Sequence, residues 1–202
     1  EKTTVIVGRN NSGKTSLAEL FRRLLTSDSP TFELEDFSLS VHERFWTAFQ
    51  LHVSGEETET VREALPLIEI SLHVNYAKNL ENYGPLGEFI IDVNPSCTEA
   101  LIIVQYRLKE GKIKNFFEDL GINPSSSIPS QKTAFFRAMK ERIPKLFGAL
   151  PVAVDPADST NRKTVEWLKL RTLVQGGFVN AHREVDDTTY KVQNVLEKSM
   201  KR

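Results

Sequence analysis

A nine-residue phosphate-binding pattern constrains this chain more than any other feature. Residues 8–16 read Gly-Arg-Asn-Asn-Ser-Gly-Lys-Thr-Ser and satisfy the pattern G-x-x-x-x-G-K-[ST]. A β-branched apolar run, 3–7, precedes the pattern, and an amphipathic helical pattern follows it. A strand, a glycine loop and a helix in this order predict an α/β fold with a P-loop NTPase core. The apolar residues of the expected helix are Leu17, Leu20, Phe21, Leu24 and Leu25.

The residue types in this loop suit a nucleoside triphosphate. Gly8 and Gly13 permit tight turns, so that successive backbone N–H groups can point at an anion, and the helix that follows adds its dipole. Lys14 can reach the β- and γ-phosphates, the Thr15 hydroxyl is the expected protein ligand of Mg²⁺, and Ser16 can contact the α-phosphate. We therefore expect ATP and Mg²⁺ as cofactors. The predicted nucleotide-binding residues are Gly8, Arg9, Asn10, Asn11, Ser12, Gly13, Lys14, Thr15 and Ser16, with Thr15 also predicted as the metal ligand.

The variable positions of the loop carry a family resemblance. Asn10 and Ser12 give the form G-x-N-x-S-G-K-[ST], which resembles the ABC-type ATPase heads of SMC and RecF-like proteins. The string continues to Leu17 and looks most like the OLD family (overcoming lysogenization defect) of AAA ATPases and nucleases. Residues 178–183, Phe-Val-Asn-Ala-His-Arg, are similar to the strand that leads into the helical arms of OLD-type heads.

The resemblance implies a function for the full-length protein. It implies Mg²⁺-dependent ATP binding, ATP hydrolysis, and a homodimer or higher oligomer formed through the ATPase heads. It further implies coupling to DNA processing, repair or phage defence, through a C-terminal endonuclease that acts on DNA. None of the residues in this chain shows the nuclease, which rests on analogy.

Two motifs of ABC-type heads are absent in their standard form. The chain has neither a Ser-Gly-Gly-Gln-like signature nor an apolar strand that ends in Asp-Glu. The segments 89–92 and 150–156 imitate a Walker B strand, but we expect Asp92 and Asp155 to end ordinary core strands. No catalytic residue is therefore assigned.

The two ends of the chain suggest the first lobe of a head. Glu1 stands two residues before the expected strand, and a helical pattern that starts after Asp186 continues to Arg202. We interpret the chain as an N-terminal fragment that is not catalytically competent alone, within a single lobe, 1–202. Its expected parts are 1–30 (strand, P-loop and helix), 31–111 (acidic helix and antiparallel sheet), 112–185 (helical and mixed region) and 186–202 (start of a helical arm).

The region between the two resembling segments is assigned from periodicity. Apolar and polar residues alternate from Ile68 to Tyr76, which predicts a half-buried strand of an antiparallel sheet, with His73 facing solvent. Residues 160–176 fit helix and strand equally. Further strands are expected at 89–93, 101–108 and 152–154, helices at 116–120, at 131–147 and from a capping box at 40–43, and a polar linker at 124–130.

Composition favours a soluble globular chain. Apolar residues make up 40% and charged residues 26%, and no apolar run approaches the length of a membrane helix. The single cysteine, Cys97, fits a reducing cytoplasm, so we expect a cytoplasmic protein without a membrane partner. The net charge of −1 gives no indication of nucleic acid. Residues 160–202 are basic, which fits either DNA contact or an ordinary solvated helix face.

Two other classes of function remain open. A self-contained P-loop kinase or nucleotide switch would use Asp92 or Asp155 for Mg²⁺. A non-catalytic lobe would use its loop only for structure and would act through protein association. The histidines lack metal-binding spacing, and His182 with Arg183 could contact phosphate or pair with Asp186 or Asp187.

Overall fold

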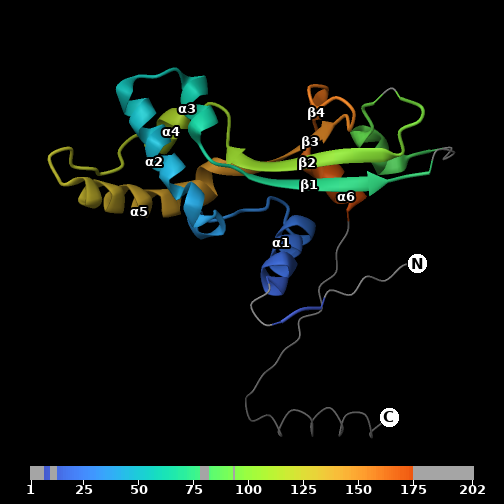
Figure 1. The fold of residues 1–202 in the computed structure, drawn as a ribbon, viewed down its shortest axis with the longest axis horizontal. Helices are drawn as coiled ribbons and strands as arrows, with labels where there is room; N and C mark the ends of the chain where they lie inside the picture. Colours follow the sequence, from blue (N-terminus) through green and yellow to red (C-terminus); the bar gives the residue numbers. More distant parts are fainter. Residues whose placement is uncertain (1–6, 10–12, 78–81, 93, 175–202) are drawn as a thin grey trace, which may run out of the picture.

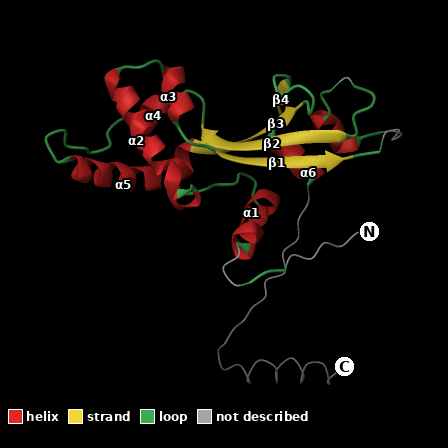
Figure 2. Cartoon of the chain, in the orientation of Figure 1, coloured by secondary structure: helices red, strands yellow, loops and turns green. Residues whose placement is uncertain are grey.

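A computed structural model describes residues 7–9, 13–77, 82–92 and 94–174 of the chain. A four-stranded antiparallel sheet runs through its centre, with a group of helices at one end (Figures 1 and 2). Helix α1, Lys14–Thr26, lies beneath the sheet in this view. The described residues thus form a mixed helix and strand fold. The expected strand at 3–7, apart from Val7, lies outside them, as do residues 178–183 and the helical pattern after Asp186.

The sheet is the antiparallel element that the alternation predicted. Along the first strand the side chains alternate between half-buried and exposed, and on the second every second residue is buried. Ile70 pairs with Val104, and Val104 pairs with Pro151, so these three strands share one apolar face. The strands, in spatial order, are β1 (Ile68–Asn75), β2 (Glu99–Leu108), β3 (Phe147–Val154) and β4 (Arg162–Thr164).

An aromatic core holds the helices at one end of the sheet. Phe45, Phe116 and Phe135 are fully buried there, together with Phe147 at the start of β3. The Phe147 ring centroid lies 5.3 Å from that of Phe116 and 6.2 Å from that of Phe45, with the rings tilted. These contacts join helices to the sheet. The helices are α2 (Leu39–Ser54), α3 (Thr58–Ala64), α4 (Ile113–Phe117) and α5 (Ile128–Leu146).

A buried tyrosine links this core to the segment after α1. The Tyr106 hydroxyl, on β2, donates to the carbonyl oxygens of Phe32 (3.0 Å) and Ile143 (3.3 Å). Its ring packs edge-on against Phe32, with centroids 5.0 Å apart. Burial raises the pKa of this phenol above its ordinary value. Tyr106 therefore connects the central strand, the end of α5 and the segment that precedes the 3₁₀ helix η1, Leu34–Asp36.

A second apolar core lies at the other end of the same sheet face. Ile102 and Ala153 contribute from β2 and β3, and Phe89 and Leu170 contribute from the 3₁₀ helix η2, Gly84–Phe89, and from α6, Trp167–Leu173. Leu24 of α1 is buried in this cluster. The Trp167 indole N–H also donates to the carbonyl oxygen of Ser27 at 3.3 Å. The end of α1 is thereby attached to α6.

The apolar residues of helix α1 differ in how far they are buried. Leu24 is buried and Leu20 packs against both cores, whereas Leu17 and Phe21 are 37% and 40% exposed. Leu20 and Leu24 are one helical turn apart, and so are Leu17 and Phe21, on a neighbouring part of the surface. The sequence predicted one continuous apolar face. The helix is confirmed, but the described sheet covers only part of that face.

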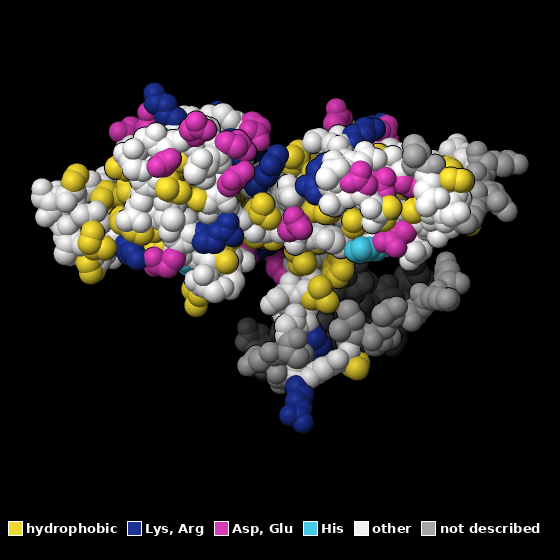
Figure 3. Space-filling view, turned by 45° about the horizontal axis from the view of Figure 1, so that its top comes forward, with side chains coloured by type: hydrophobic (Ala, Val, Ile, Leu, Met, Phe, Trp, Pro, Cys, Tyr) yellow, Lys and Arg dark blue, Asp and Glu magenta, His cyan; other side chains and the backbone are white. Residues whose placement is uncertain are grey.

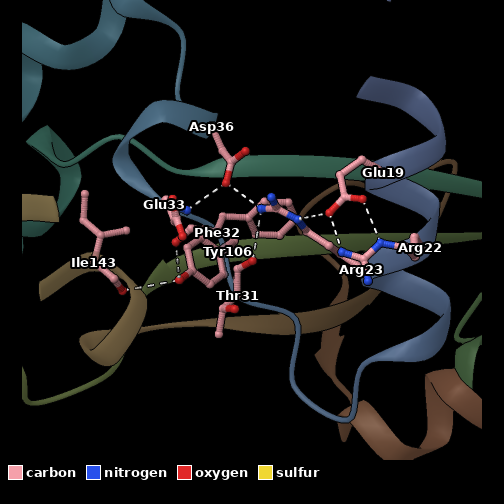
Figure 4. Close-up of polar contacts among 9 residues, drawn as sticks. All are labelled: Glu19, Arg22, Arg23, Thr31, Phe32, Glu33, Asp36, Tyr106 and Ile143. Atoms are coloured by element: carbon pink, nitrogen blue, oxygen red, sulfur yellow. Dashed lines mark hydrogen bonds and ion pairs between the residues drawn. The ribbon is translucent and has the colours of Figure 1, made fainter. Parts of the chain in front are cut away.

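A cluster of ion pairs fixes α1 to the following segment (Figure 4). Arg23 donates to the Glu19 carboxylate at 2.9 Å and to the Asp36 carboxylate at 2.5 Å, so it links α1 to η1. Arg22 donates twice to Glu19, at 2.7 and 2.6 Å. These hydrogen bonds from Arg22 and Arg23 lower the pKa of Glu19 to about 2.

Two predicted helix starts differ from the structure. Helix α2 begins at Leu39 after Ser38, without a side-chain cap, so the capping box predicted at 40–43 is wrong. A reciprocal box occurs instead at η1, where the Glu33 N–H donates to Asp36 at 2.8 Å. Helix α5 begins at Ile128, inside the predicted polar linker at 124–130, because Pro129 fits the first helical turn. It ends at Leu146, since Phe147 already pairs with β2.

The region between β1 and β2 also differs from its prediction. A strand was expected at 89–93, but η2 ends at Phe89 and no strand follows among the described residues up to Asp92. Phe89 anchors this segment by burial in the second core rather than by strand pairing. The helix expected at 116–120 lies three residues earlier in the chain, at Ile113–Phe117. Residues 160–176, which fitted helix and strand equally, contain both β4 and α6.

None of the described helices combines the length and the apolar character that crossing a membrane requires.

Replacing Tyr106 by phenylalanine should destabilise the fold without creating a large cavity in the core. The ring remains, but two carbonyl oxygens lose a buried donor, at a cost of about 1–2 kcal/mol. Urea unfolding of the variant and of the half-buried control Tyr76→Phe measures the difference. Equal losses in the two variants would contradict the role assigned to the Tyr106 hydroxyl.

The Glu19 cluster should make stability depend on pH in the acid range. Because the folded-state pKa of Glu19 is lowered, its contribution is fully present above the ordinary value of 4.5 and is lost as the pH falls towards about 2. The unfolding free energies of the wild type and Glu19→Gln should therefore converge across this window. Urea titrations at successive pH values test this, and a pH-independent difference would rule it out.

Candidate nucleotide-binding site

The structure describes part of the predicted loop. Gly8, Arg9, Gly13, Lys14, Thr15 and Ser16 are described, whereas Asn10, Asn11 and Ser12 lie outside the described residues. Gly13 has a left-handed backbone conformation, with φ of 80° and ψ of 5°, and it is the N-cap of α1. Among the described residues, no atom beyond its chain neighbours and the helix's own backbone lies within 4 Å of a Cβ placed on Gly13. Glycine is therefore favoured here by the backbone turn, not by lack of space.

The start of α1 is suited to an anion. The first intrahelical bond runs from the Leu17 N–H to the Gly13 carbonyl oxygen at 2.9 Å. The N–H groups of the first turn precede it, and they have no acceptor within the helix. The first turn carries no acidic side chain to offset the positive end of the helix dipole. Thr15 and Ser16 are exposed at this end, so their hydroxyls can reach a ligand there.

Lys14 closes the described part of the loop. Its ammonium donates to the carbonyl oxygens of Gly8 at 2.7 Å and Arg9 at 2.6 Å, which brings the two ends of the loop together. The side chain thus reaches from the start of α1 back to the first two residues of the motif. An ammonium in this place can exchange a carbonyl acceptor for a phosphate oxygen, and such a charge-assisted hydrogen bond is stronger than a neutral one.

An open groove of about 440 Å³ lies along α1, with Thr15 and Ser16 at one end. One wall is a single face of α1, from Thr15 and Ser16 to Arg23, and the other comes from the segment after α1 and from β1. Figure 4 shows the charged residues of this region facing one another across the two segments. The lining residues are Thr15, Ser16, Glu19, Leu20, Arg23, Phe32, Asp36 and Ile68.

The groove includes residues that the motif search did not identify. Glu19, Arg23, Phe32 and Asp36 were not predicted as site residues. The spacing of Ser16, Glu19 and Arg23 on one helical face was a signal that could have found part of this wall. Nothing in the sequence pattern places Asp36 beside Arg23, because that contact depends on how the chain folds back after α1.

The two Walker B-like aspartates lie in local turns. Asp92 accepts a hydrogen bond from the Asn94 N–H at 3.0 Å. Asp155 accepts from the Ala157 N–H at 2.9 Å and from the Asn161 side-chain amide at 3.3 Å. Asp155 follows the last residue of β3, as expected for the end of a core strand, whereas Asp92 follows no strand. Neither aspartate lines the groove beside α1.

The described part of the chain shows no metal site built from the histidines, the cysteine or the carboxylates. No group of three or more His, Cys, Asp or Glu side chains there is arranged to hold a metal ion. His73 is exposed, as predicted, and pairs with Glu99. His52 stacks on Phe117, with centroids 5.3 Å apart. Cys97 is half-buried, and its thiol donates to the Glu99 carbonyl oxygen. His182 and Arg183 lie outside the described residues.

A comparison with protein-family models identifies a family for this chain. The family model described as an AAA ATPase domain matches residues 1–201. No match to the chain was found among curated proteins or among solved structures. The family match supports ATP binding and an ATPase kind of activity, and it covers nearly the whole chain. The chain therefore belongs to the AAA ATPase domain family.

Proposed function

We propose that this chain binds MgATP through the loop at residues 8–16 and that the full-length protein hydrolyses ATP. The observation that carries the proposal is the start of α1. Gly13 turns the backbone into the helix, the first turn has no acidic side chain, and the Lys14 ammonium contacts the carbonyl oxygens of Gly8 and Arg9. Together they offer backbone N–H groups, a helix dipole and an ammonium to a polyphosphate.

Each predicted loop residue has a role in this proposal. Lys14 contacts the β- and γ-phosphates, and Ser16 contacts the α-phosphate. The segment from Asn10 to Ser12 supplies further backbone N–H groups to the phosphates. Gly8 and Arg9 are included because their carbonyl oxygens already accept hydrogen bonds from the Lys14 ammonium, at 2.7 and 2.6 Å.

Thr15 is the proposed protein ligand of Mg²⁺. Its exposed hydroxyl follows Lys14 directly in the first turn of α1, and a hydroxyl oxygen suits this hard cation. When bound, Mg²⁺ would reduce the negative charge of the phosphate oxygens. No catalytic residue is assigned, because neither Asp92 nor Asp155 lines the groove beside the loop.

The wider role follows the resemblance to OLD-type and SMC/RecF-like heads. We propose that chain 1–202 is one lobe of such a head, with parts 1–30, 31–111, 112–185 and 186–202. The heads would pair as a homodimer or higher oligomer in the cytoplasm, and ATP would act as a switch of their geometry. Coupling to DNA processing, repair or phage defence is proposed for the full-length protein by analogy.

The face drawn in Figure 3 gives little support to DNA contact. On the face drawn in Figure 3, acidic and basic side chains are interspersed over both ends of the sheet. Such mixed charge does not favour a polyanion.

A self-contained kinase or nucleotide switch is less well supported. It would need Asp92 or Asp155 for Mg²⁺, but both carboxylates accept hydrogen bonds in local turns. ATP turnover by this chain that Asp155→Asn abolished would favour this alternative.

Removing the Lys14 ammonium should weaken ATP binding by at least about tenfold, since a charge-assisted hydrogen bond contributes roughly 1.5–3 kcal/mol. The matched control is Lys114→Ala, which removes an exposed ammonium that pairs with Glu118. Isothermal titration of ATP against Lys14→Ala and Lys114→Ala makes the comparison. If the two variants bind ATP as tightly as the wild type, the loop is not the binding site.

Replacing Thr15 by valine should reduce the amount by which Mg²⁺ strengthens ATP binding. Valine keeps the shape but removes the hydroxyl, so ATP affinity should fall with Mg²⁺ present and change little with EDTA. The measurement is ATP affinity of both proteins under the two conditions. An equal loss with and without Mg²⁺ would contradict the assignment of Thr15 as the metal ligand.

A further inference from the structure

We draw no further inference here: the strongest candidate, the exposed apolar patch of Leu17 and Phe21 on α1, beside Leu72 of the edge strand β1, carries nothing because no feature of the described residues shows what covers it.

Discussion

The burial of one face of strand β2 is the constraint on which the rest of the structure depends. Every second residue from Ala100 to Leu108 is buried, and these residues serve two cores. Ile102 and Val104 belong to the core with η2 and α6, whereas Tyr106 belongs to the aromatic core of the helices. Because a strand exposes its side chains alternately, a shift of one residue would expose this whole set to water. The central strand thus fixes where both groups of helices can pack.

Helix α1 connects this framework to the candidate site. Its middle and end are attached to the sheet through Leu20 and Leu24, and its N-terminus is left to carry the loop. Two contacts, Arg23 with Asp36 and Trp167 with Ser27, hold its second half to separate parts of the fold. A fixed helix gives its N-terminal N–H groups a fixed direction, which is the condition for binding phosphate with little loss of conformational freedom.

Much of the fold could be predicted from local patterns, and two of the wrong predictions share one cause. The alternation in β1 and the apolar faces of α2 and α5 predicted these elements, because each pattern reflects burial of one side. The strand expected at 89–93 is wrong, because an apolar run of this length fits either a strand or another buried segment. The predicted C-terminal end of α5 at Phe147 is also wrong, because Phe147 pairs with β2 and does not belong to the helix. The periodicity of apolar residues indicates which residues are buried, but it does not indicate which element they pack against.

The sequence by itself determined the candidate loop and the chemistry expected there. Gly13, Lys14 and Thr15 are adjacent in the chain, so their local spacing suffices to place a turn, a cation and a hydroxyl at one helix start. Only the tertiary structure decided what lies beside them. Asp36 meets Arg23, and Ile68 faces Leu20 across the groove, because the chain returns to α1 after long intervals. Such contacts depend on how the two cores pack on β2, and no local pattern encodes that packing.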